Sequence, residues 1–215
     1  DSVNAGPFAS FFAHSRIQFC LAQQDPQGNA TNGIDRVTSP TTFNQSNYDN
    51  LKHTSSCGVN AWDPTKYFNI WVAVSADGTL GVATFPEGGD QQEQGIVLAL
   101  ESFGNNPAYV APAFSLGRTA VHETGHFFFA RHIWGDGGGC QSDFPIVAGI
   151  SGSWSDDTPT QSGATIGCPS GMQPPGCGTP NPPGKMYQNY MDYTNDACYC
   201  MFTINQVLRM ETVLD

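Results

Sequence analysis

Residues 122–132 have the sequence HETGHFFFARH, the stretch that decides the fold. His122 and His126 are four residues apart, so on an α-helix their side chains project from one face, one turn apart. Two imidazoles in this arrangement can bind one metal ion, and Glu123 lies beside them, where its carboxylate can face a water molecule on that ion. We therefore expect a helix over residues 119–130 that carries a metal site.

His132 adds a third imidazole ten positions after His122. Three histidine ligands leave one tetrahedral position open for water, which is the arrangement of a catalytic zinc site. Spacings of four and six residues do not lie on one straight helix, so we expect the chain to leave the helix between His126 and His132. A single such histidine could equally be a hydrogen-bonded core residue, but the set of three beside Glu123 favours zinc.

Apolar patterns on both sides of this helix predict a β-rich N-terminal half and an irregular C-terminal half. The near-continuous apolar stretch 67–74 predicts a strand buried on both faces. Asp77-Gly78 is typical of a hairpin turn and would make residues 80–85 the partner strand. Further strands are expected over 17–22 and 95–100 and helices over 41–52 and 205–214, whereas residues 137–190 are expected to form mostly loops.

The charge balance of the 215-residue chain excludes some classes of partner. With 8 Lys and Arg against 19 Asp and Glu, the net charge is −11. Nucleic acids and anionic membranes attract clustered basic residues, so we expect neither as a partner. No apolar stretch approaches the ~18 residues of a membrane-spanning helix. The length predicts one domain with two lobes around a cleft.

The seven cysteines indicate the compartment. Five of them lie after the central helix, among Gly and Pro, and their spacing lacks the paired C-x₂-C knuckles of a zinc ribbon. We interpret them as disulfides and expect a secreted, extracellular protein, or a periplasmic or cell-surface one. The chain begins without a signal peptide, which we interpret as the mature, processed form.

The extended stretch HETGHFFFARHIWGD resembles the zinc motif of the metzincin metallopeptidases, and the continuation HIWGD at residues 132–136 resembles the pappalysin family. The segments LGRTAVHE before the motif and NYMDYTNDACYCMFTINQVLRM near the C-terminus also match. The resemblance implies a single α/β metzincin-like catalytic domain (residues 1–215). A twisted mixed sheet and the active-site helix would form an N-terminal lobe (about 1–132), and an irregular, disulfide-tied C-terminal lobe (about 133–215) would follow.

The resemblance also implies a role for each motif residue. His122, His126 and His132 would be the zinc ligands, and Glu123 would act first as general base and then as general acid. Met191 would form the hydrophobic floor of the Met-turn beneath the metal. Tyr193 would steady the oxyanion of the tetrahedral intermediate through its phenol group, although a merely packed aromatic residue is the alternative.

One residue departs from the family pattern. Metzincins usually have Gly seven residues after the first histidine, and this chain has Phe129. Either Phe129 adopts a strained backbone, or the helix ends by a different turn. Asp136 would anchor the loop after His132, or it belongs to a simple Gly-Asp turn.

By rough alignment to the family, the cysteines would pair as Cys140–Cys177 and Cys168–Cys198, although Cys198 and Cys200 could exchange roles. Cys20 and Cys57 could form a third bridge. The family also binds structural calcium in the loops that follow the zinc motif. Candidate ligands here are Asp143, Asp157 and Thr158, whose oxygen atoms suit Ca²⁺, and a solvated acidic turn is the alternative.

These implications give an expected function: a secreted zinc endopeptidase that acts on proteins and peptides as a monomer. Some relatives prefer Arg after the scissile bond. Asp196 would line the corresponding pocket, unless Ala197 occupies that position. An N-terminal prodomain is expected from the family and is absent from this chain. A catalytically weak zinc-containing binding or adhesion module and a non-peptidase zinc hydrolase remain the alternatives.

Overall fold

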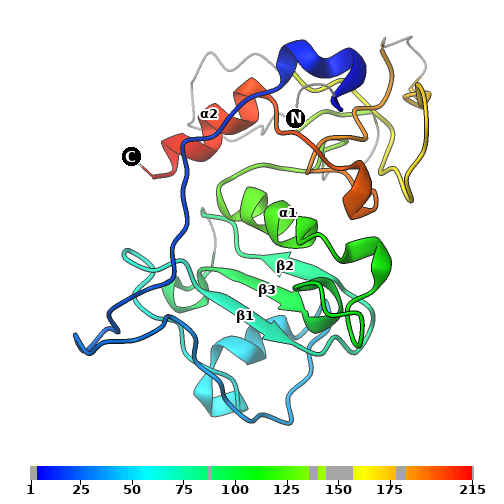
Figure 1. The fold of residues 1–215 in the computed structure, drawn as a ribbon. Coiled ribbons are helices and arrows are strands. Elements are labelled where there is room, and N and C mark those ends of the chain that lie inside the picture. The colour runs from blue at the N-terminus through cyan, green and yellow to red at the C-terminus, as the bar shows by residue number, and fades with distance from the viewer. Residues whose placement is uncertain (1–3, 87–88, 136–139, 144–156, 178–182, 215) are drawn as a thin grey trace. The chain divides into compact units, whose positions relative to one another are not determined.

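A computed structural model describes residues 4–86, 89–135, 140–143, 157–177 and 183–214 (Figure 1). The chain forms two compact units. One unit comprises Arg16–Phe127, and the other comprises Asp1–Ser15 together with Phe128–Asp215. The first residues therefore group with the C-terminal part of the chain. That both units make up one catalytic domain stays a prediction.

A small mixed sheet forms the centre of the Arg16–Phe127 unit. Its strands are β1 (Ile70–Ala73), β2 (Gly81–Ala83) and β3 (Ile96–Ala99), arranged in the order β1-β3-β2. β3 runs parallel to β1 and antiparallel to β2. All four residues of β3 are buried, as its central place predicts. The predicted mixed sheet is thus confirmed.

Two expectations for these strands were wrong. Residues 67–74 are not buried on both faces, because β1 is an edge strand and Ile70 and Val72 are 46% and 40% exposed. The turn at Asp77-Gly78 does form, with Asp77 Oδ1 accepting a hydrogen bond from the Thr79 N–H at 3.0 Å. It does not join paired strands, however, because β3 lies between β1 and β2.

The segment 17–22 was predicted as a strand, and none forms there. Phe19 and Leu21 are 59% and 63% exposed, so the alternating residues have no core against which to pack. The turn that follows does form. The Asp25 side chain accepts hydrogen bonds from the backbone N–H groups of Gln27 and Asn29 at 3.0 and 2.7 Å.

Of the helix predicted over residues 41–52, only a short 3₁₀ helix at Tyr48–Lys52 forms. Asparagine side chains before it bond to nearby backbone instead. Asn47 Oδ1 accepts from the Asn44 N–H at 2.7 Å, and Asn44 Oδ1 accepts from the Ser46 N–H at 2.8 Å. Such local bonds compete with helix formation.

Helix α1 (Arg118–Phe127) packs against β2 and β3 (Figure 1). It begins and ends near the predicted limits but stops before Ala130. Seven 3₁₀ helices are present in the described residues: Gly6–Phe11, Tyr48–Lys52, Thr54–Ser56, Gln91–Glu93, Leu100–Ser102, Pro112–Phe114 and Asp196–Cys198. None of the helices among these residues is both long and apolar enough to cross a membrane.

The second unit is irregular, apart from its short 3₁₀ helices and helix α2 (Ile204–Thr212), which confirms the predicted C-terminal helix. A capping box starts α2: the Thr203 side chain accepts from the Gln206 N–H, and the Gln206 side chain accepts from the Thr203 N–H. The hydrophobic core of this unit contains the buried side chains of Phe8, Ile133, Met186, Met191 and Met201.

Disulfides Cys140–Cys177 and Cys168–Cys198 tie this unit, so both expected pairings are confirmed. Each closes a long loop, which typically contributes about 2–4 kcal/mol. The third bridge, between Cys20 and Cys57, was wrong: both residues are exposed thiols.

A buried ion pair fixes α2 to the loop after Cys140. Asp143 and Arg209 are 1% and 5% exposed, and the Arg209 guanidinium donates to Asp143 Oδ2. Asp143 Oδ1 accepts from Thr158 Oγ1 at 2.7 Å. A charge so deeply buried is costly without its partner.

We therefore expect Arg209→Met to lower the free energy of unfolding by about 3–5 kcal/mol, because it leaves the Asp143 carboxylate buried and uncompensated. Urea unfolding at neutral pH measures this. The control is Lys66→Met, which breaks the exposed Lys66–Asp63 pair and should change stability little. An effect of Arg209→Met no larger than that of the control would contradict the assignment.

Candidate active site

Helix α1 presents the first part of the candidate site. His122, Glu123 and His126 are each 6% exposed. The two imidazole rings lie one turn apart, with centroids 4.7 Å from each other and planes at 85°. Phe85, which follows β2, packs its ring 5.2 Å from that of His126. Residue spacing predicted the first three residues but not Phe85, which nothing in the sequence pattern distinguishes.

The chain leaves α1 through a strained residue. Phe129 has φ = 75°, in the left-handed region that a bulky side chain rarely adopts. Of the two alternatives that the sequence left open, the strained backbone is therefore the one observed. Phe129 is also buried, and the Arg131 guanidinium lies 5.8 Å from its ring. Packing of the ring thus offsets the cost of the backbone conformation.

Two aromatic rings orient His132. Its imidazole stacks on Trp134 with centroids 4.4 Å apart and planes at 5°. Tyr193 meets His132 and Trp134 edge-on, with centroid distances of 4.9 Å in both cases. Tyr193 is 46% exposed. Trp134 belongs to the HIWGD stretch, yet its role as the stacking partner was not predicted.

A tight turn containing the fully buried Met191 supports this cluster. The Ile133 N–H donates to the Met191 carbonyl at 3.3 Å, and the Met191 N–H donates to Asn189 Oδ1 at 2.9 Å. Next in the chain, Asp192 Oδ1 accepts from the backbone N–H of Tyr193 at 2.8 Å. Burial raises the pKa of Asp192. These bonds fix the backbone from which Tyr193 projects.

His122, His126 and His132 fit a metal site. Each offers one ring nitrogen, and these three atoms all lie within 4.8 Å of one another. Three neutral nitrogen donors are the ligand set of a catalytic zinc centre. Glu123 stands beside them in α1, and burial raises the pKa of its carboxyl to about 8.

The other predicted residues have different surroundings. Asp143 pairs with Arg209, as described above. Asp157 accepts from Thr203 Oγ1 at 2.6 Å and from the Asn205 N–H at 2.9 Å, at the start of α2. Both carboxylates and Thr158 thus make bonds within the chain, and a calcium site there stays a prediction. Asp136 lies outside the described residues.

Asp196 is 2% exposed and begins the 3₁₀ helix Asp196–Cys198, which the Cys168–Cys198 disulfide anchors. Ala197 follows it in the same turn. That one of these two residues lines the specificity pocket stays a prediction.

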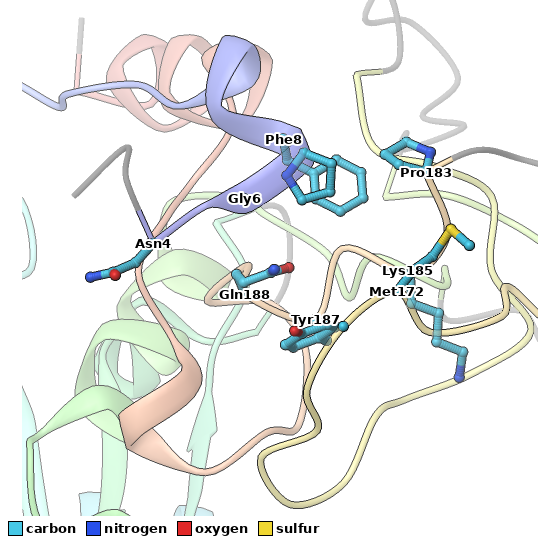
Figure 2. A pocket seen from close by; sticks show the side chains of 10 residues that line it. Asn4, Gly6, Phe8, Met172, Pro183, Lys185, Tyr187 and Gln188 are labelled. Carbon is cyan, nitrogen blue, oxygen red and sulfur yellow. The ribbon is translucent and has the colours of Figure 1, made fainter.

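A pocket of about 320 Å³ lies elsewhere in the second unit (Figure 2). Figure 2 shows the Gln188 amide reaching into it between Phe8 and Tyr187, whereas the Lys185 ammonium points away. That ammonium donates to the Gly163 and Ala164 carbonyls at 3.0 and 3.3 Å. None of the candidate zinc or catalytic residues lines this pocket, so it is separate from the candidate active site.

The histidine-bearing helix beside a mixed sheet, the third histidine after a sharp turn and the buried methionine turn define the metzincin class of metallopeptidase folds. The chain belongs to the M43 peptidase family, the pappalysins: the family model described as pregnancy-associated plasma protein-A matches residues 50–215.

Curated and solved relatives agree with this family. The chain is 32% identical over 204 residues to an extracellular metalloprotease of Pyricularia oryzae, covering 94% of this chain and 62% of the relative. It is 33% identical over 165 residues to one of Arthroderma benhamiae, covering 76% of this chain and 51% of the relative. The chain thus spans roughly half to three fifths of these relatives' length.

The solved structure of mature mirolysin from Tannerella forsythia, in complex with a cleaved peptide, is similar over 100% of this chain and 77% of its own. The TM-score is 0.88 at 41% sequence identity. A mutant of promirolysin from the same organism matches with a TM-score of 0.86 at 40% identity, over 99% of this chain and 67% of its own.

The left-handed backbone of Phe129 yields a direct test. Replacing Phe129 by Gly or by Ala removes the same ring, but only Gly tolerates φ = 75° without strain. We expect Phe129→Gly to be more stable than Phe129→Ala by about 1 kcal/mol in urea unfolding. At Phe128, which is also buried and lacks a positive φ, the order should reverse. If the Ala variant is more stable than the Gly variant at both positions, the backbone of Phe129 is not strained.

The buried Glu123 carboxyl predicts a pH dependence for the metal-free protein. Because its pKa rises to about 8 from 4.5, the folded protein keeps a proton that the unfolded chain releases within this window. The free energy of unfolding should therefore fall as pH rises from about 4.5 to about 8. Thermal unfolding of the metal-free native protein and of metal-free Glu123→Gln, at a series of pH values, measures this dependence. The substitution should flatten the profile, and an unchanged slope would contradict the pKa shift.

Proposed function

We propose that this chain is a secreted zinc-dependent endopeptidase that hydrolyses peptide bonds of proteins and peptides. The observation that carries the proposal is the buried carboxyl of Glu123, on the same helix as two histidines of a three-imidazole metal site. Its membership of the M43 family supports the same chemistry. We further propose that the two units act as one catalytic domain and that the chain is a monomer.

His122, His126 and His132 would hold the zinc ion. When bound, zinc acts as a Lewis acid, lowering the pKa of water toward ~7 and polarising the scissile carbonyl. Glu123 would take a proton from the attacking water and deliver it to the leaving amine.

Tyr193 would stabilise the oxyanion that develops on the scissile carbonyl. The residue is 46% exposed, and its ring lies edge-on against His132 and Trp134. A hydrogen-bond donor held near a developing negative charge lowers the barrier by roughly 2.7–4 kcal/mol in other enzymes. The turn at Met191 supports this placement, because the Asp192 carboxylate holds the backbone N–H of Tyr193.

A preference for Arg after the scissile bond is the finer proposal. Asp196 supplies a buried carboxylate two residues after Thr194, close in sequence to Tyr193. A carboxylate in a pocket favours guanidinium through charge-assisted hydrogen bonds. If Ala197 lines that pocket instead, the preference should shift toward apolar side chains.

Secretion is supported by the two disulfides, which form in oxidising compartments, and by the names of the fungal relatives, which are extracellular metalloproteases. The promirolysin structure supports the proposal that a prodomain precedes the catalytic domain in the whole protein. Calcium binding remains a prediction without a supporting contact in the described residues.

Two other functions would use the same residues: a zinc-containing binding or adhesion module, and a non-peptidase zinc hydrolase. A binding module has no need of an acid–base group, so Glu123 beside the metal site favours catalysis. The solved relative in complex with a cleaved peptide favours a peptidase over other hydrolases.

We expect the zinc-loaded protein to cleave a proteome-derived peptide library and a chelator to abolish the cuts. Glu123→Gln should lower kcat about 10²–10⁴-fold, the usual range for loss of a general base. Zinc content should stay the same. Glu211→Gln, in α2, is the control and should keep full activity.

Mass spectrometry of the cuts separates the proposals. Arg enriched after the scissile bond, and lost in Asp196→Ala, would place Asp196 in the pocket. Cuts without this preference would remove the pocket assignment alone. A folded, zinc-loaded protein that makes no cuts would overturn the peptidase proposal.

A further inference from the structure

Gly81, the first residue of β2, faces Glu123 of α1 at very short range. A Cβ atom built at Gly81 would lie 2.6 Å from Glu123 Cγ, 2.8 Å from Oε1 and 2.9 Å from Cδ. Carbon atoms without a bond between them pack at about 3.5–4.0 Å. The Glu123 side chain therefore occupies the space in which any other residue at position 81 would carry its Cβ.

Glycine is required at position 81 because there is no room for a Cβ atom, and not because of the backbone conformation. Among the described residues, positive φ angles occur at many glycines, including Gly78, but Gly81 is not one of them. Its backbone pairs with Leu98 in the ordinary register of β2 and β3. Alanine could therefore adopt the same backbone angles without strain, and only the approach of Glu123 excludes it.

The surroundings of Gly81 leave the backbone little freedom to retreat. β2 is hydrogen-bonded to the fully buried β3, and α1 packs on both strands. Just after β2, Thr84 is fixed from two sides: its N–H donates to the Gly95 carbonyl at 3.1 Å, and its Oγ1 accepts from the buried Lys52 Nζ at 2.8 Å. An added Cβ would thus displace the Glu123 side chain rather than the strand.

We propose that Gly81 is a positioning residue for Glu123: its missing side chain creates the slot in which the carboxylate lies beside the metal-binding histidines. The inference rests on the proposed function, in which that carboxylate transfers the protons of hydrolysis. A general base acts only within about 2.6–3.2 Å of its proton, and a misplacement of 1 Å can cost about 10²-fold in rate. A methyl group at position 81 is large enough to cause such a shift.

The test compares Gly81→Ala with native zinc-loaded protein on one peptide substrate. We expect kcat to fall about 10²-fold, with KM within about twofold and zinc content unchanged. Gly163→Ala is the matched control, because Gly163 has no positive φ and nothing lies within 4 Å of a Cβ placed there. It should keep native kcat. A Gly81→Ala protein with native kcat would overturn the inference.

A second measurement tests the contact without activity. In Glu123→Ala the Cγ, Cδ and Oε1 atoms that crowd position 81 are gone. Gly81→Ala should therefore lower the melting temperature of the metal-free native protein but not that of metal-free Glu123→Ala. Equal shifts in both backgrounds would overturn the inference. If native protein shows no chelator-sensitive cleavage, the proposed function fails, and this comparison alone still decides whether Gly81 makes room for Glu123.

Discussion

The structure depends on one geometric constraint: a helix can supply two imidazoles to one metal ion, but not a third at the spacing found here. His122 and His126 lie one turn apart on α1, and His132 must come from a chain that has left the helix. The departure occurs through Phe129, held at φ = 75°. Beyond it, stacking on Trp134 sets the plane of the third imidazole. The third histidine thus reaches the site by way of a residue with a left-handed backbone.

A second constraint acts on Glu123, the proposed general base, whose carboxyl is buried. Burial raises the pKa of its carboxyl to about 8 in the metal-free protein. The position of its side chain is limited by the sheet, because Gly81 of β2 gives it room that any Cβ would fill. The small sheet therefore limits where the Glu123 side chain can lie.

The sequence predicted the features that depend on local spacing or on family resemblance: the helix with two histidines, the strand 95–100, the C-terminal helix and both disulfides. Features set by tertiary pairing were missed. The Asp77-Gly78 turn could not reveal that β3 would insert between β1 and β2. The apolar run 67–74 could not show that β1 lies at an edge. Ring partners such as Phe85 and Trp134 follow from packing, which spacing alone does not encode.

We expect the three histidines to bind a single zinc ion. Zinc titration of metal-free protein, followed by calorimetry for the native chain and for His122→Ala, His126→Ala and His132→Ala, measures this. The native chain should bind one zinc ion, and each variant should bind it at least about tenfold more weakly, because each loses one of three nitrogen ligands. Native affinity in His132→Ala would show that His132 is not a ligand, and the turn at Phe129 would then serve no metal site.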